Sequence, residues 1–194
     1  MNKQIILLLL SGFIFFGCED DTALDNSIYV YDSQNPGLPE YSELGYNTFG
    51  AYYDRQSFTS SSIVPIKVIV TGGVTSFSLN GWKANHEMSL TVQMSDFLPQ
   101  DYTDLLELHD TILDLEDEDY TVTIEDDGAE QEAEILNGTF HFKRIQNLYV
   151  DKELYGVVLS GTFEFQALVD GEPITVSKGR FDVSVNENNF YVID

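Results

Sequence analysis

The stretch "FEFQALVDGEPITV", residues 163–176, indicates how this chain folds because it joins two alternating segments through a turn signal. Apolar residues occupy every second position in 163–165 and again in 174–176. Such a period places one face of a strand toward a core and the other toward water. Asp170-Gly171 lies between the two segments and suits a tight turn with positive φ. The stretch therefore predicts an antiparallel hairpin.

The same alternation recurs along most of the chain. Further alternating segments are 66–70, 77–79, 90–94, 120–124, 140–142 and 181–185. Further turn signals are Thr71-Gly72-Gly73, Asn80-Gly81, Asp126-Asp127-Gly128, Asn137-Gly138 and Lys178-Gly179. Many short strands at this spacing predict an all-β fold, an antiparallel β-sandwich or barrel of about 8–10 strands with at most one short helix.

Two segments share the pattern Gly-Thr-Phe-x-Phe, at 138–142 and 161–165. Repeat folds need three or more copies, and the chain has no third. We interpret the similarity as chance between two aromatic strands.

The segment 101–115 departs from the two-residue period. Leu105, Leu108, Ile112 and Leu115 step by three and four residues, which is helical spacing. Asp101 suits the N-cap of this helix. The alternative is a short helix followed by a strand over residues 111–115.

The amino terminus has the pattern of a secretory signal peptide over residues 1–17. Lys3 precedes an apolar run at 5–16, and the small residue Gly17 follows it. A membrane-spanning helix needs roughly twenty apolar residues, so this run is too short.

Cys18 is the only cysteine of the chain and comes directly after this run. Phe15-Phe16-Gly17-Cys18 resembles the lipobox of bacterial lipoproteins, in which the cysteine is lipidated. Several acyl chains on one residue anchor a protein stably to a membrane. We therefore expect Cys18 to be a lipid anchor. The alternative is a free thiol near a cleavage site.

Composition and charge divide the remaining chain into two parts. Residues 18–42 are acidic and rich in turn residues, which predicts a lipidated tether. Residues 43–194 are long enough for one all-β domain with a core of its own. The net charge of −24 excludes nucleic acid as a partner, because the phosphate backbone would be repelled.

Two segments resemble signatures of an uncharacterised Bacteroidota-type lipoprotein family. The first is Gly45-x-Asn47-Thr48-Phe49-Gly50-Ala51, and the second comprises residues 159–165 and 176–183. The family domain has no assigned activity, so the resemblance implies a lipoprotein and a fold class only. Tyr53-Asp54-Arg55 stands where members of the family carry Asn-Gly after the first signature.

The same resemblance extends to the residues after the cysteine. Glu19-Asp20-Asp21 is similar to the acidic address that carries such lipoproteins to the outer face of the outer membrane. The alternative is a solvated tether without an address. Asp21-Thr22-Ala23 resembles the O-glycosylation site of these bacteria, which implies a glycan on Thr22.

The densest acidic run supplies candidate metal ligands. Asp114, Glu116 and Glu118 could offer carboxylate oxygens to calcium, although Asp119 stands where an EF-hand loop needs glycine. The alternative is a solvated charged loop. The three histidines are far apart and give zinc no local support; they are His86, His109 and His141. No other cofactor is indicated.

Aromatic side chains are the remaining candidates for binding. Trp82, Tyr52 and Tyr53 could form a flat platform for sugar rings. The alternative is that Trp82 fills the core at the start of a strand.

No nucleophile elbow, phosphate-binding loop or dinucleotide motif occurs in the sequence. We therefore predict a lipid-anchored module in the outer membrane that faces the cell exterior, is non-catalytic, and binds or scaffolds a glycan or a surface protein. The alternative is a small carboxylate-based hydrolase of surface polysaccharide.

Overall fold

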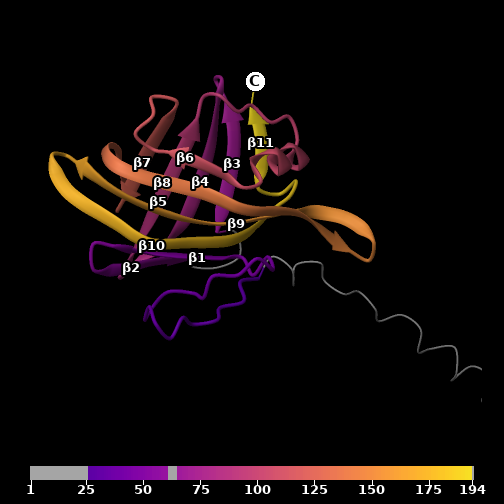
Figure 1. Ribbon diagram of the computed structural model, residues 1–194, viewed down its shortest axis with the longest axis horizontal. Coiled ribbons are helices and arrows are strands. Elements are labelled where there is room, and N and C mark those ends of the chain that lie inside the picture. The colour runs from indigo at the N-terminus through magenta and orange to yellow at the C-terminus, as the bar shows by residue number, and fades with distance from the viewer. Residues whose placement is uncertain (1–25, 61–64, 194) are drawn as a thin grey trace, which may run out of the picture.

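The computed structural model describes residues 26–60 and 65–193, and their strands form one eleven-stranded sheet (Figure 1). The strands are β1 (Thr48–Tyr53), β2 (Gln56–Ser60), β3 (Ile66–Thr71), β4 (Val74–Lys83), β5 (His86–Met94), β6 (Thr111–Asp114), β7 (Tyr120–Asp126), β8 (Ala129–Val150), β9 (Glu153–Val169), β10 (Glu172–Val185) and β11 (Phe190–Ile193). The predicted all-β class is confirmed.

The sheet closes on itself. From β4 the antiparallel pairing runs through β5, β7, β8, β9, β10, β1 and β2, and β2 pairs again with β4. The ring can close because two strands share the second edge of β4. β2 pairs with residues 81–83, and β3 pairs with residues 74–79. β3 then carries β11 as a parallel neighbour outside the ring. Closure favours the barrel over the sandwich.

Phenylalanines fill the barrel beneath β8, β9 and β10. The ring of Phe140 stacks on Phe163 at 5.5 Å and on Phe181 at 4.9 Å between centroids. Phe142 lies edge-on to Phe181 at 5.8 Å. All four side chains are buried. Such aromatic pairs each contribute about 0.5–1.5 kcal/mol beyond their buried area.

The two Gly-Thr-Phe-x-Phe segments are neighbours, one in β8 and one in β9. Phe140 pairs with Phe163, and each glycine lies opposite a phenylalanine: Gly138 opposite Phe165, and Gly161 opposite Phe142. A Cβ on Gly161 would lie 2.0 Å from the carbonyl oxygen of His141. The shared pattern therefore has a structural role, because the glycine of each copy leaves room for the backbone of the other copy.

Three of the predicted turns are confirmed and three are wrong. Turns lie at Thr71-Gly72-Gly73, Asp126-Asp127-Gly128 and Asp170-Gly171. Asn80-Gly81, Asn137-Gly138 and Lys178-Gly179 instead lie inside β4, β8 and β10. In these strands the glycines allow close approach. A Cβ on Gly81 would meet the Thr59 carbonyl oxygen at 2.1 Å, and one on Gly179 would meet that of Phe163 at 2.3 Å.

The segment 101–115 forms a short helix and then a strand. The 3₁₀ helix η2 (Tyr102–Leu108) begins at Asp101, whose carboxylate accepts from Thr103 N–H in a capping box with Asp104. Strand β6 follows, and it pairs with β8. Among the described residues, no helix has the length and apolar character needed to cross a bilayer.

The amino-terminal part of the described chain packs on the barrel, although the sequence predicted a tether up to residue 42. Leu38 is 0% exposed. The carboxylate of Asp32 accepts a hydrogen bond from Arg180 Nη1 at 2.6 Å. Figure 1 shows this indigo segment beside β1, β2 and β10. The folded part therefore begins before residue 43.

The segments that carry the two family-like signatures lie side by side. β1 pairs with β10, with Thr48 opposite Asp182 and Phe49 opposite Phe181. Just before β1, the N–H groups of residues 44–46 donate to the buried carboxylate of Asp182. Both segments therefore serve to close the barrel and to fasten the amino-terminal segment to it.

Candidate functional site

Trp82 lies on the outer face of the barrel. Along β4, Leu79, Gly81 and Lys83 are buried, whereas Asn80 and Trp82 are exposed. The indole is 41% exposed. Trp82 therefore does not fill the core, which was the alternative that the sequence left open.

The indole lines a groove of about 540 Å³. The groove forms where the turn after β4 and the turn after β7 come together, and the N–H of Asp127 donates to the carbonyl oxygen of Glu87 at 3.4 Å. Glu87 lies directly opposite Trp82 on β5. The other polar groups that line the groove are Asn80, Asn85, His86, Ser89, Glu125 and Asp127.

A charged cluster on the inner side holds these strands together. Lys83, 8% exposed, forms an ion pair with Asp126 of β7. The Nε2 atom of His86 lies 2.7 Å from the other oxygen of Asp126. The ammonium group of Lys83 also lies 4.5 Å from the ring centroid of Tyr53. The cluster therefore links β1, β4, β5 and β7 beneath the groove.

The groove combines an exposed aromatic face with amide and carboxylate groups. Indole faces pack against the C–H groups of sugar rings, and amides and carboxylates bond to hydroxyls. Glu87, Glu125 and Asp127 make the groove acidic, so it disfavours anions. An uncharged hydroxylated ligand fits this chemistry best.

The predicted aromatic platform is not assembled. Neither Tyr52 nor Tyr53 lines the groove of Trp82. The hydroxyl of Tyr52 donates to the carbonyl oxygen of Pro36 at 2.9 Å, so this side chain fastens the amino-terminal segment. Tyr53 packs against the core. Of the three aromatic residues, Trp82 alone remains a candidate.

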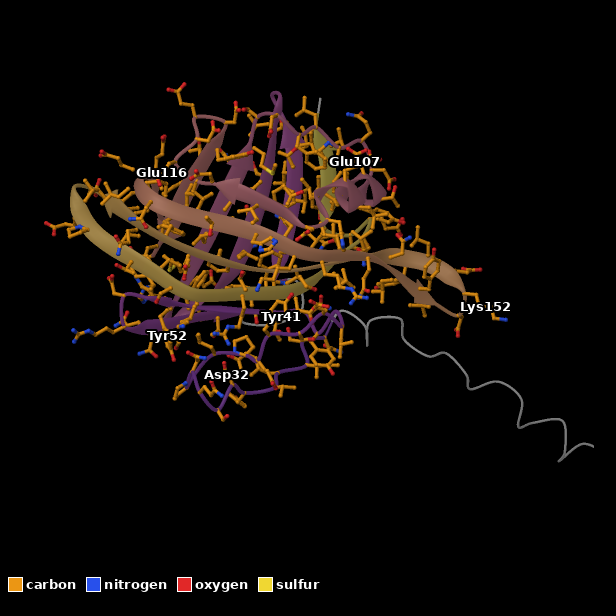
Figure 2. The ribbon with its side chains drawn as sticks, in the orientation of Figure 1. Asp32, Tyr41, Tyr52, Glu107, Glu116 and Lys152 are labelled. Atoms are coloured by element: carbon orange, nitrogen blue, oxygen red, sulfur yellow. The ribbon has the colours of Figure 1, made fainter. Side chains whose placement is uncertain are left out.

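The predicted calcium ligands do not converge. Asp114 ends β6, and Glu116 and Glu118 lie in the exposed loop that follows. The Oδ1 atom of Asp114 accepts from the N–H of Glu116 at 3.2 Å, which is a local turn bond. Within residues 26–60 and 65–193, no group of three or more histidine, cysteine or acidic side chains is arranged to hold a metal. Figure 2 shows Glu116 on the side of the barrel away from the amino-terminal segment.

The other two histidines have structural partners. His109 caps η2, and its Nδ1 atom accepts from the N–H of Ile145 at 3.1 Å. The Nε2 atom of His141 lies 3.3 Å from Asp110 on the surface. The predicted lipidation residue Cys18 and the predicted glycosylation residue Thr22 lie outside the described residues.

Sequence reasoning missed most of the groove. Asn80, Asn85, Glu87, Glu125 and Asp127 come from three strands and two turns. Their side chains meet only because β5 pairs with both β4 and β7 in a fixed register. The alternation of apolar residues indicates the strands. The pairing of β5 with β7 has no local signal, because η2 and β6 lie between these two strands in the chain.

None of the protein-family models, curated proteins or solved structures that we compared matches the chain. The resemblance to the lipoprotein family therefore stays a prediction from the signature residues.

Proposed function

We propose that the protein is a lipoprotein, anchored through Cys18 on the outer face of the outer membrane, that binds an uncharged glycan in the groove of Trp82 without chemical turnover. The observation that carries the proposal is the exposed indole in a groove that is lined mostly by polar residues, among them two amides and three carboxylates. A residue selected only to fill the core would be buried.

The groove is suited to binding in both its apolar and its polar parts. A sugar ring packs against the indole, while Asn80 and Asn85 offer both donors and acceptors. Glu87 and Glu125 accept from hydroxyl groups. The charged cluster of Lys83 and Asp126 fixes the strands beneath, so little order has to be gained on binding.

A hydrolase is the second candidate, because Glu87, Glu125 and Asp127 line the same groove. Glycoside hydrolysis needs two carboxylates roughly 5–10 Å apart, one of them protonated. Measuring reducing ends after incubation with each bound glycan separates the two functions. Retention without new reducing ends supports binding, and their release supports hydrolysis.

The test of binding uses the full lipoprotein in detergent on an array of neutral oligosaccharides of glucose, galactose, mannose and xylose. We expect retention of at least one class by the wild type and loss of it by Trp82→Ala. The matched control is Tyr149→Ala, which removes an aromatic side chain that is 60% exposed and outside the groove. Absence of retention by the wild type would reject the proposal.

The anchor and the location have separate tests. Mass spectrometry of the mature amino terminus should find acyl chains on Cys18, and an unmodified thiol would reject the anchor. Protease added to intact cells should remove the domain from the surface. Full protection would place it on the periplasmic side.

A further inference from the structure

A second groove gathers much of the scarce positive charge of the protein. The chain has 9 lysines and arginines against 33 acidic residues. Lys143, Lys178 and Arg180 nevertheless line one groove of about 430 Å³, together with Tyr41. It lies between the amino-terminal segment and the outer face of β8, β9 and β10. Figure 2 shows Tyr41 on the side of the barrel where this segment packs.

The two lysines of this groove are available to a ligand. Lys143 lies at a bulge of β8, and its Nζ atom is 5.2 Å from the ring centroid of Tyr41. Both lysines are exposed, and neither forms an ion pair with any residue that the structure describes. Arg180 differs, because Asp32 neutralises it and Pro39 also accepts from it. Arg180 therefore lines the groove with its charge already paired.

Tyr41 provides an uncharged ring beside these lysines. Burial, with a further contribution from the hydrogen bond to Glu43, raises the pKa of the Tyr41 hydroxyl. The hydroxyl donates to Glu43 Oε1 at 2.9 Å, and Arg144 donates to the other oxygen at 3.1 Å. These bonds hold the ring in place over the groove.

The groove continues along the sheet into a second groove, and the two together are called the trough below. A neighbouring groove of about 440 Å³ shares Thr139 and Glu164 with it. Apart from the carboxylate of Glu164, the polar lining of this second part is neutral, and its residues are Asn137, Gly138, Gln166, Thr175 and Ser177. These groups match a chain of hydroxylated rings in an extended arrangement.

We propose that this trough binds an acidic oligosaccharide, with an anionic group of one sugar between Lys143 and Lys178 and the following rings along Thr139 and the polar floor. The site is independent of the Trp82 groove, with which it shares no lining residue. Exposed charges about 4 Å apart attract by about 1 kcal/mol in water. Glu164 is the acidic residue that lines both parts of the site, where it opposes the charges of Lys143, Lys178 and Arg180. More distant acids of the surface are screened beyond about 8 Å at physiological salt.

The test is calorimetric titration of the full lipoprotein in detergent with trigalacturonic acid and with its methyl ester, which has the same size and no charge. A second arm uses galactose 6-phosphate to separate a phosphate from a carboxylate as the anionic group. We expect the acid, the sugar phosphate or both to bind. The ester should bind at least about tenfold more weakly than the acid, corresponding to about 1.4 kcal/mol.

Variants assign the binding to the trough. The double variant Lys143→Gln and Lys178→Gln should weaken binding at least about tenfold. The matched control, Lys67→Gln with Lys152→Gln, makes the same change of charge at exposed sites outside the trough and should bind as the wild type does. All four lysines are exposed, so both double variants should fold, which circular dichroism checks.

Three outcomes would overturn the proposal. The first is that neither acidic probe binds, and the second is equal binding by the two double variants. The third is that inorganic phosphate binds as tightly as the sugar phosphate while trigalacturonic acid does not bind, which would reduce the site to a simple anion site.

Discussion

The carboxylate of Asp182 accepts a hydrogen bond from the backbone N–H of Gly45 at 2.8 Å, between residues 137 positions apart in the chain. The N–H groups of Leu44 and Tyr46 and the hydroxyl of Ser160 donate to the same carboxylate. Asp182 is 1% exposed, so these bonds replace its hydration. This cluster attaches the segment before β1 to β10.

Asp182→Asn should destabilise the protein strongly. The amide offers one acceptor oxygen in place of two and turns an N–H₂ group toward backbone donors, which leaves buried donors unpaired. We expect the free energy of unfolding in urea to fall by about 3 kcal/mol. The control is Asp151→Asn, which makes the same change at an exposed residue of the β8–β9 turn and should have little effect.

Gly161→Ala should be more harmful than an alanine at a glycine with positive φ. The Cβ at position 161 would lie 2.0 Å from the His141 carbonyl oxygen and 2.5 Å from the ring of Phe181. We expect a loss of at least about 3 kcal/mol in the free energy of unfolding. At Gly72, where φ is +59° and the Cβ meets no atom, alanine should cost about 1 kcal/mol. Equal losses at the two positions would contradict the packing argument.

The lowered pKa of Asp32 predicts that the stability of the packed amino-terminal segment depends on pH. Hydrogen bonds from the Asn35 amide, the Gln34 N–H and the Arg180 guanidinium hold the pKa of Asp32 well below its usual range. A lowered pKa in the folded state stabilises the fold above the unfolded pKa of about 4, and this stabilisation is lost as the pH falls further. The wild type should therefore exceed Asp32→Asn in stability at neutral pH, and the difference should shrink below about pH 4.

Hydrogen exchange gives the local measurement for Asp32→Asn. The N–H of Glu40 donates to Val30 at 2.7 Å, and that of Leu38 donates to Asn35 at 3.1 Å. Both amides should exchange at least about tenfold faster in the variant at pH 7 if the segment is released. Unchanged exchange would mean that Leu38 holds the segment by its burial alone.

The strands were predictable because their signal is local. In residues 163–165 and 174–176 the two-residue period separates the core face from the water face without any knowledge of the partner strand. The capping residue Asp101 was predictable for the same reason. In contrast, Asn80-Gly81 looks like a turn locally, and only the approach of Thr59 from β2 explains a glycine inside β4.

The site was less predictable than the fold. Trp82 could be selected as an aromatic residue, but its outward direction depends on the register of β4 between β2 and β5. The position of the lysines in the trough depends on the pairing of β9 with both β8 and β10. Lys143 and Lys178 come together through β9, and Arg180 meets Asp32 across 148 residues. Contacts between residues so far apart in the chain cannot be predicted from one sequence.

The affinity of Trp82→Ala for the neutral glycan that the wild type retains best decides whether the indole binds the ligand. Because the indole is the main apolar surface of the groove, calorimetry should find binding weakened at least about tenfold. The free energy of unfolding should fall by no more than about 3 kcal/mol, because Trp82 is 41% exposed and its truncation removes only part of the buried area of a core residue. An affinity within about twofold of the wild type, with the fold intact, would mean that the groove of Trp82 does not bind the glycan.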